Sequence, residues 1–401
     1  MSEQTKKLVP MKRFPEFQDA AEWEEMKLGQ LGKLVSGLTY SPDDIRDSGL
    51  LVLRSSNVQN GEITLDDNVF VTSDIRGANL SKPNDILICV RNGSKALIGK
   101  NALIPEGMPL CTHGAFMTVF RSPTAKFVFQ LFQTTAYQKQ VDGDLGATIN
   151  SINGSQFIKY KFYVPKPLEQ QKIADCLSSI DELITAQTQK ITALKDHKKG
   201  LMQQLFPAEG ENIPKLRFPE FQSEADWINL KLGEVLGSES STIAQNKQHF
   251  QKSGYPIYGA DGLIGYIASY EQFEDYIAII KDGSGVGRLS LYKKESSILG
   301  TLAYLKIKSV ERYSLNWVFY LLQTINLSKY IKGSGIPHIY YKDYAGEFIR
   351  IPTLTEQQKI ADCLSSIDEL IKAQTQQLEF YKTQKKGLMQ QLFPSLNEVS
   401  E

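Results

Sequence analysis

Arginine, asparagine, glutamine and lysine side chains gather in several short loops of this 401-residue chain, beside glycine or serine. Arg, Asn and Gln can form paired hydrogen bonds with base edges, whereas Lys and backbone amides hold phosphates. As a group these loops favour contact with DNA, although a solvated loop side chain is the alternative at any single position. The candidate DNA-binding residues are Arg54, Asn57, Gln59, Asn92, Ser94, Lys95, Lys100, Asn150, Asn153, Lys281, Ser284, Arg288, His338, Tyr340, Tyr341 and Lys342.

Motifs that would indicate catalysis are missing from the sequence. The stretch from Gly93 to Lys100 is similar to a phosphate-binding loop, but it has one residue too many between its glycines. Asn101 also replaces the Ser or Thr that such a loop requires. The glycines at 283, 285 and 287 miss the dinucleotide-binding spacing, and the four histidines form no metal-binding pattern. We therefore expect a non-catalytic chain with neither a metal nor a cofactor of its own.

The charge balance limits how the chain could bind DNA. Lys and Arg total 45, as do Asp and Glu, so the net charge is zero. This argues against binding through bulk positive charge alone and requires either a local basic face or a partner that neutralises phosphates.

Only four cysteines occur and none form a CxxC pair, which fits a reducing cytoplasm. No apolar run approaches the length of a membrane span.

An internal repeat organises the chain. Residues 169–207 and 356–394 differ at only 8 of 39 positions, and both begin Glu-Gln-Gln-Lys-Ile-Ala-Asp-Cys-Leu. An entry motif, Arg-Phe-Pro-Glu-Phe-Gln, occurs at 13–18 and again at 217–222. The stretches between entry motif and repeat have diverged. Nearly constant segments beside divergent modules indicate that the modules bind different things; uneven drift after a duplication is the alternative.

The two repeated segments have the pattern of long helices with a heptad seam. The seam alternates steps of four and three residues, and it continues through Lys198 in the first copy and Lys385 in the second. The apolar seam of a single helix would be exposed to water, so each helix is the simplest packing partner for the other. Alternatively, both seams could face solvent. Each helix would span roughly 50–55 Å at ~1.5 Å per residue. The seam residues that we single out are Ile173, Leu177, Ile180, Ile184, Gln187, Ile360, Leu364, Ile367, Ile371 and Gln374.

Prolines and capping signals mark the helix ends. Pro165 and Pro167 precede the first helix, while Thr355 and Gln358 have the spacing of a capping box on the second. The predicted segments are 1–167 (entry segment and first recognition domain), 168–207 (first spacer helix), 208–226 (linker and second entry segment), 227–353 (second recognition domain), 354–394 (second spacer helix) and 395–401 (tail).

Both variable domains are predicted to have an α+β fold. Strand-like runs at 49–54, 85–90 and 276–280 are punctuated by Gly-rich and Asn-rich turns, and short helices are expected at 127–140 and 315–330. A regular βαβ alternation is not present.

The chain resembles the specificity (S) subunit of Type I restriction-modification enzymes. The resemblance rests on the paired helices that end Lys-Lys-Gly-Leu-Met-Gln-Gln-Leu-Phe-Pro, on the Arg-Phe-Pro-Glu-Phe entries, on residues 57–61, and on residues 255–259 with 262–266. It implies two target-recognition domains of mixed strands and short helices, joined and separated by two long antiparallel coiled-coil helices in a pseudo-twofold duplication.

The same resemblance implies partners and a division of labour. Each domain would read one half of a bipartite, asymmetric site in double-stranded DNA. Two modification (methyltransferase) subunits would supply S-adenosylmethionine and adenine methylation, and restriction subunits would supply ATP- and Mg-dependent cleavage. Two other interpretations stay open: a stand-alone protein-interaction adaptor built on the coiled coil, and an enzyme whose site is not recognised.

Overall fold

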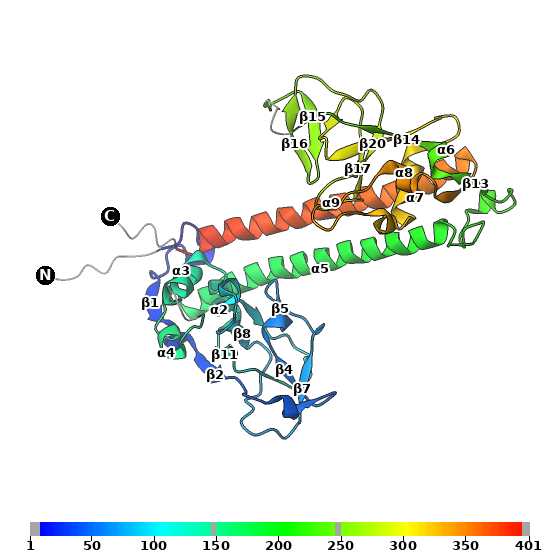
Figure 1. Ribbon diagram of the computed structural model, residues 1–401. Coiled ribbons are helices and arrows are strands. Elements are labelled where there is room, and N and C mark those ends of the chain that lie inside the picture. The colour runs from blue at the N-terminus through cyan, green and yellow to red at the C-terminus, as the bar shows by residue number, and fades with distance from the viewer. Residues whose placement is uncertain (1–8, 146–149, 245–249, 395–401) are drawn as a thin grey trace. The chain divides into compact units, whose positions relative to one another are not determined.

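The computed structural model describes residues 9–145, 150–244 and 250–394 (Figure 1). The chain divides into two compact units: unit 1 comprises Met1–Gln187 and Leu378–Glu401, and unit 2 comprises Thr188–Gln377. Each unit thus combines one strand-rich domain with the first part of one long helix and the last part of the other. This division cuts across the chain order, because both long helices contribute to both units.

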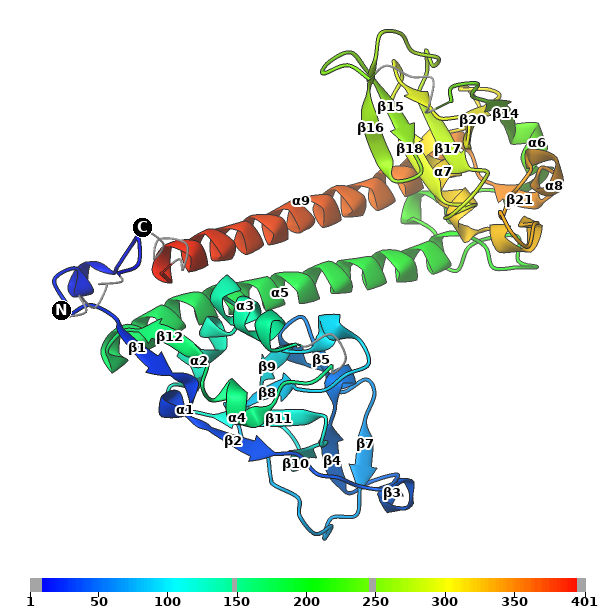
Figure 2. The same cartoon turned by 60° about the vertical axis from the view of Figure 1, so that its left-hand side comes forward.

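The two long helices are α5 (Pro167–Leu205) and α9 (Leu354–Leu392). Pro167, predicted to precede the first helix, is the first residue of α5. Proline suits that position, because the amide it lacks would have no partner in the helix. The predicted capping box at Thr355 is wrong: α9 starts at Leu354, so Thr355 lies inside its first turn. Within each unit, its part of α5 and its part of α9 run side by side in opposite directions (Figures 1 and 2).

The seam residues lie on the sheltered side of each helix. Ile173 and Leu177 are buried in the core of unit 1, and Ile360 and Leu364 in the core of unit 2. The other six residues singled out in the seam are half-buried. The paired helices are also expected to set the distance between the two domains that would read DNA. This expectation stays a prediction.

Unit 1 is built around a four-stranded antiparallel sheet of order β2-β11-β8-β9 and a second sheet of order β10-β4-β7-β3. β1 pairs with β12, which joins the start of the domain to its end directly before α5. Its strands are β1 (Glu24–Lys27), β2 (Lys33–Ser36), β3 (Ile45–Arg46), β4 (Leu50–Leu53), β5 (Val58–Gln59), β6 (Glu62–Ile63), β7 (Val69–Val71), β8 (Ile86–Cys89), β9 (Asn101–Leu103), β10 (Cys111–His113), β11 (Met117–Arg121) and β12 (Lys161–Val164). Its short helices are α1 (Leu28–Leu31), α2 (Ala125–Leu131), α3 (Thr135–Asp144) and α4 (Gly154–Phe157).

Unit 2 repeats this plan with shorter connections. The sheet β14-β20-β17-β18 corresponds to β2-β11-β8-β9, β13 pairs with β21, and a smaller sheet has the order β16-β15-β19. Its strands are β13 (Ile228–Lys231), β14 (Leu236–Ser240), β15 (Tyr255–Gly259), β16 (Gly262–Ile267), β17 (Tyr276–Ile280), β18 (Leu289–Tyr292), β19 (Ser297–Ile298), β20 (Leu302–Ile307) and β21 (Phe348–Ile351). Its short helices are α6 (Leu232–Val235), α7 (Leu315–Thr324) and α8 (Tyr341–Tyr344).

The central strands of both sheets read as continuous apolar runs because both of their faces are covered. All four residues of β8 and all five of β17 are buried. One face packs against α2 in unit 1 or α7 in unit 2, together with the ends of the long helices. The α+β class predicted from the sequence is confirmed. Among the residues that the structure describes, no helix is both long and apolar enough to cross a membrane.

Candidate nucleic-acid interface

In both units, the loop that follows the central strand lies against a segment far along the chain. In unit 1, the Ile152 amide donates to the Val90 carbonyl at 2.8 Å, and the Asn92 amide donates to the Asn150 carbonyl at 3.4 Å. The loop at 90–100 is thereby fixed beside residues 150–153. Four predicted positions on the first segment (92, 94, 95 and 100) and two on the second (150 and 153) thus come together.

Unit 2 has the equivalent arrangement. The Ile339 amide donates to the Lys281 carbonyl at 2.9 Å, and the Gly283 amide donates to the Pro337 carbonyl at 2.9 Å. The loop at 281–288 therefore lies beside the segment 337–342. Every residue predicted for the second domain falls on one of these two segments, although they are about fifty positions apart in the sequence.

A glycine closes each of these loops. The Gly99 amide donates to the Cys89 carbonyl at 2.9 Å, and the Gly287 amide donates to the Ile280 carbonyl at 2.8 Å. Both glycines have a positive φ, 82° and 86°, which L side chains rarely adopt. Lys100 and Arg288 directly follow these glycines and directly precede β9 and β18. They therefore occupy equivalent positions in the two units.

A third loop, residues 54–61 after β4, joins the cluster in unit 1. The Asn92 side-chain amide donates to Ser55 Oγ at 3.2 Å, which ties this loop to the loop after β8. Gln59 is exposed, and Arg54 forms an ion pair with Asp67 at 2.7 Å.

Asn57 differs from its predicted role. Its side chain is fully buried, accepts from the Arg54 amide at 2.9 Å, and donates to the Thr64 and Asp67 carbonyls at 3.0 and 3.1 Å. All of this bonding holds the loop together, and the buried side chain therefore favours a structural role for Asn57 over contact with a base edge. An Asn after a strand is equally typical of a turn, and the sequence pattern alone does not separate the two roles.

Three other asparagines at the site also use part of their hydrogen-bonding capacity within the fold. Asn153 accepts from the Ser155 amide and caps α4, and Asn150 donates to the Gly93 carbonyl at 3.0 Å. Asn92 Oδ1 accepts from the Ser94 amide. The Ser94 and Lys95 side chains are exposed, and Lys100 is half-buried.

Two basic residues of the unit 2 group contact neighbouring parts of that unit. The Arg288 guanidinium binds the Ala260 carbonyl and the Asp261 carboxylate, which places it under the tip of the β15–β16 hairpin. The Asp261 side chain is 96% exposed at that tip. Lys281 Nζ donates to Ser240 Oγ at 3.3 Å, and Ser284 is exposed.

The last segment of unit 2 carries an aromatic group. The His338 ring lies 5.0 Å from the Tyr340 ring, and the Lys342 ammonium lies 5.6 Å from the centre of that same ring. Tyr340 is exposed, whereas the Tyr341 hydroxyl donates to the Leu236 carbonyl and anchors α8 to β14. Tyr341 is therefore the tyrosine of this pair whose hydroxyl is used in the fold.

Arg91 and Phe116 also lie in the unit 1 cluster, although they are not among the candidate residues predicted from the sequence. Arg91 is exposed, and its guanidinium lies 5.7 Å from the centre of the exposed Phe116 ring. The Val90 and Arg91 amides both donate to the Phe116 carbonyl. The Arg91-Asn-Gly-Ser motif, which recurs as Lys281-Asp-Gly-Ser, was a usable signal for Arg91. Phe116 depends on the pairing of β8 with β11, which the sequence does not reveal.

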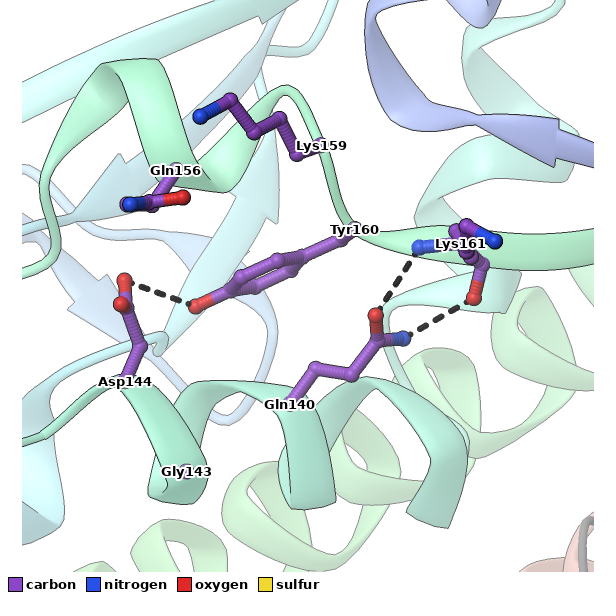
Figure 3. A pocket seen from close by; sticks show the side chains of 7 residues that line it. All are labelled: Gln140, Gly143, Asp144, Gln156, Lys159, Tyr160 and Lys161. Atoms are coloured by element: carbon purple, nitrogen blue, oxygen red, sulfur yellow. Dashed lines mark hydrogen bonds between the residues drawn. The ribbon is translucent and has the colours of Figure 1, made fainter.

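A pocket of about 300 Å³ lies elsewhere in unit 1, between α3 and residues 156–161 (Figure 3). Its hydrogen bonds hold secondary structure together: the Gln140 amide both donates to and accepts from the Lys161 backbone, at 3.0 and 2.9 Å. The Tyr160 hydroxyl donates to Asp144 at 3.2 Å, and burial raises the pKa of this phenol. The lining contains amides, lysines, one carboxylate and one phenol, which suits a polar recess that joins α3 to β12.

Comparison with known proteins places the chain in a family. A family model described as "Type I restriction modification DNA specificity domain" matches residues 20–196 and 224–379. The Type I restriction enzyme StySPI specificity subunit of Salmonella potsdam is 23% identical over 235 residues, which is 56% of this chain and 50% of that subunit. The chain thus matches only half the length of that relative.

Two further comparisons cover more of the molecule. The Type I restriction enzyme MjaIX specificity subunit of Methanocaldococcus jannaschii is 23% identical over 75% of each chain. The crystal structure of the S subunit of a Type I restriction-modification system from M. genitalium has the same fold, with a TM-score of 0.69 at 18% identity, over 97% of this chain and all of that one. Since the family model matches both copies of the repeat, the chain belongs to the Type I restriction-modification DNA specificity family.

Proposed function

We propose that this chain is a non-catalytic specificity subunit that reads a bipartite, asymmetric DNA site, one half with each unit. The observation that carries the proposal is the shared construction of the two loop clusters. The same backbone hydrogen bonds hold the loop after β8 and the loop after β17, yet the side chains they present differ. A common frame with different side chains is what two readers of different half-sites require.

The electrostatics support dependence on a partner. Unit 1 presents Arg91, Lys95 and Lys100 on its loop, but the whole chain has no net charge. Phosphate contacts supply much of the affinity of a DNA-binding protein. We therefore propose that the modification subunits complete the phosphate contacts, and that they bring S-adenosylmethionine while restriction subunits bring ATP and Mg.

The helices themselves support docking of two copies of one partner. The eight differences between the repeated segments are at 185, 190–194, 196 and 197, and residues 169–184 are identical to 356–371. Packing constrains mainly the buried positions of a helix, yet exposed positions match too, including Leu183 at 48% and Leu370 at 42% exposure. The exposed positions shared by both copies are Gln171, Lys172, Asp175, Ser179, Glu182 and Leu183, with Gln358, Lys359, Asp362, Ser366, Glu369 and Leu370.

A domain exchange tests the reading function. Residues 23–164 are replaced by the corresponding domain of another specificity subunit, and methylated adenines are mapped in the presence of the modification subunit. One half-site should change while the other half-site and the bases it contains stay the same. Loss of both halves in a folded protein would contradict one reader per unit, and methylation by the purified chain alone would contradict the non-catalytic assignment.

A salt titration tests the loop cluster. Lys95→Ala and Lys100→Ala should weaken DNA binding by the assembled complex similarly for all sequences, and each should lower the slope of log K against log salt by about 0.9 if it holds one phosphate. Lys190→Ala, on an exposed face of α5, is the matched control. Unchanged slopes in both loop variants would remove the cluster from the DNA interface.

A stoichiometry measurement tests docking. Leu183→Asp and Leu370→Asp should each reduce the bound modification subunits from two to one by mass photometry, and together they should abolish binding. Thr192→Glu is the matched control, because the second copy carries Glu379 at that position. Two bound subunits in the double variant would place docking elsewhere, and binding of unrelated proteins without DNA would favour the adaptor function.

A further inference from the structure

A carboxylate in unit 1 links three different parts of that unit. Asp181 of α5 accepts from Lys385 Nζ of α9 at 2.6 Å through one oxygen. Its other oxygen accepts from the side-chain amide of Gln130 on α2, at 2.8 Å. Gln130 is buried, and the Lys385 side chain is only 17% exposed. The recognition domain and both long helices therefore meet at one group.

Unit 2 contains the equivalent group with different chemistry on the domain side. Lys198 Nζ of α5 donates to both oxygens of Asp368 on α9, at 2.6 and 2.7 Å. The Tyr320 hydroxyl of α7 donates to Asp368 Oδ2 at 2.8 Å, and the Lys198 ammonium lies 4.9 Å from the centre of the Tyr320 ring. Asp181 and Asp368 are equivalents in the repeat, as are Lys198 and Lys385.

Lys198 and Lys385 occupy seam positions that are otherwise largely apolar. A polar residue in such a seam usually specifies the register of paired helices, because other registers leave it without a partner. A slip by one heptad would place Asp181 opposite Leu378 or Leu392. It would place Asp368 opposite Ile191 or Leu205. Neither aspartate would then face a cation.

We propose that Asp181 and Asp368, with Lys385 and Lys198, are positioning residues that select one register of α5 against α9 and orient each recognition domain on that register. The inference rests on the proposed function, because the register matters for the distance between two half-sites. A slip by one heptad moves a helix by about 10 Å at ~1.5 Å per residue. That is roughly three base pairs of DNA at ~3.4 Å per step along each strand.

The direct test measures the register without DNA. Spin labels are attached at Glu182→Cys and Lys386→Cys, two exposed positions of unit 1, in a chain in which Cys176 and Cys363 are replaced by alanine. Pulsed electron-spin distance measurements should give one narrow distribution. A variant with leucine at all four charged positions keeps an apolar seam, and it should show a second population displaced by about 10 Å.

A charge exchange separates selection of the register from general stability. Asp181→Lys should broaden the distance distribution, and Asp181→Lys with Lys385→Asp should restore it. Gln130 can accommodate the exchange, since its buried Oε1 has no hydrogen-bond partner and can accept from a lysine. Glu379→Gln, in an exposed pair within α9, is the control that should change nothing.

The functional measurement uses the complex with the modification subunit and DNAs whose gap differs by up to three base pairs. The starting chain should prefer one gap, and the four-leucine variant should lose at least tenfold of this preference while the half-site bases stay the same. A single narrow distance and an unchanged gap preference in that variant would overturn the register proposal. Absence of any gap preference in the starting chain would instead contradict the proposed function, while the spin-label distances still judge the register.

Discussion

The buried ion pair between Arg217 and Glu356 is expected to be a major local contribution to the stability of unit 2. The guanidinium donates to both carboxylate oxygens, at 2.9 and 2.8 Å, and to the carbonyls of Glu224 and Ala225. The Glu356 side chain is only 1% exposed. The pair fastens the second entry motif to the first turn of α9.

Removal of the cation should be costly because the anion cannot be rehydrated. Breaking a buried pair by truncating one partner typically costs about 3–5 kcal/mol. We expect Arg217→Met to fall near 3 kcal/mol, at the lower end, since Glu356 lies in the first turn of α9, where the helix dipole stabilises negative charge. Glu356→Leu should cost less than Arg217→Met, because the guanidinium keeps its two carbonyl partners.

The double variant discriminates between a lost charge partner and a lost contact. Arg217→Met with Glu356→Leu should recover most of the stability, to within about 1 kcal/mol of the starting protein, because no buried charge remains. Urea unfolding followed by hydrogen exchange gives the loss for unit 2 separately from unit 1. Glu220→Gln, in the exposed pair with Lys359 of the same unit, is the control, and it is expected to change stability by less than about 1 kcal/mol. A loss below 1 kcal/mol for Arg217→Met, or additive losses in the double variant, would refute the reasoning.

Three further changes have defined outcomes. Asn57→Ala should destabilise unit 1 by about 1–3 kcal/mol in urea unfolding, because it leaves backbone groups of the loop unpaired, and it should leave the recognised bases unchanged in methylation mapping. Burial holds the pKa of His113 below its usual value. As the pH falls, the imidazole is therefore protonated in the unfolded chain before it is protonated in the folded one. Unit 1 should accordingly lose stability as the pH falls below about 6.5. In unfolding measured between pH 5 and 7, His113→Gln should remove this dependence, whereas the exposed His197→Gln should retain it. Arg288→Gln should speed hydrogen exchange in the β15–β16 hairpin and leave unit 1 unaffected; unchanged protection there would show that the guanidinium does not support the hairpin.

Much of the architecture could be predicted because the sequence repeats it. The heptad pattern and the flanking prolines located both long helices, and continuous apolar runs located β4, β8 and β17. The structure adds pairings between strands distant in sequence, such as β8 with β11, which no local pattern encodes. The wrong capping box illustrates the same limit, since Thr355 has the correct spacing but the helix begins one residue earlier.

The candidate site was predictable as loops and much less so as individual side chains. Glycine, asparagine and basic residues identified the segments at 90–100 and 281–288 that the structure brings against their distant partners. Asn57 shows why single residues escape prediction: the same amide that can read a base can also close its own loop. Phe116 shows a different limit, because its place beside Arg91 follows from the pairing of β8 with β11 and not from its neighbours in the sequence.

The division of the long helices between units has a consequence for biosynthesis. The hydrophobic core of unit 1 includes Leu392 and Phe393, and the Phe393 ring lies 6.2 Å from Trp23 and 5.7 Å from Phe127. Unit 2 is continuous along the chain, from Thr188 to Gln377. The ribosome therefore completes every part of unit 2 before it has made the last helical turns of unit 1. The domain synthesised first is the last to be finished, and until then Trp23 and Phe127 lack their contact with the Phe393 ring.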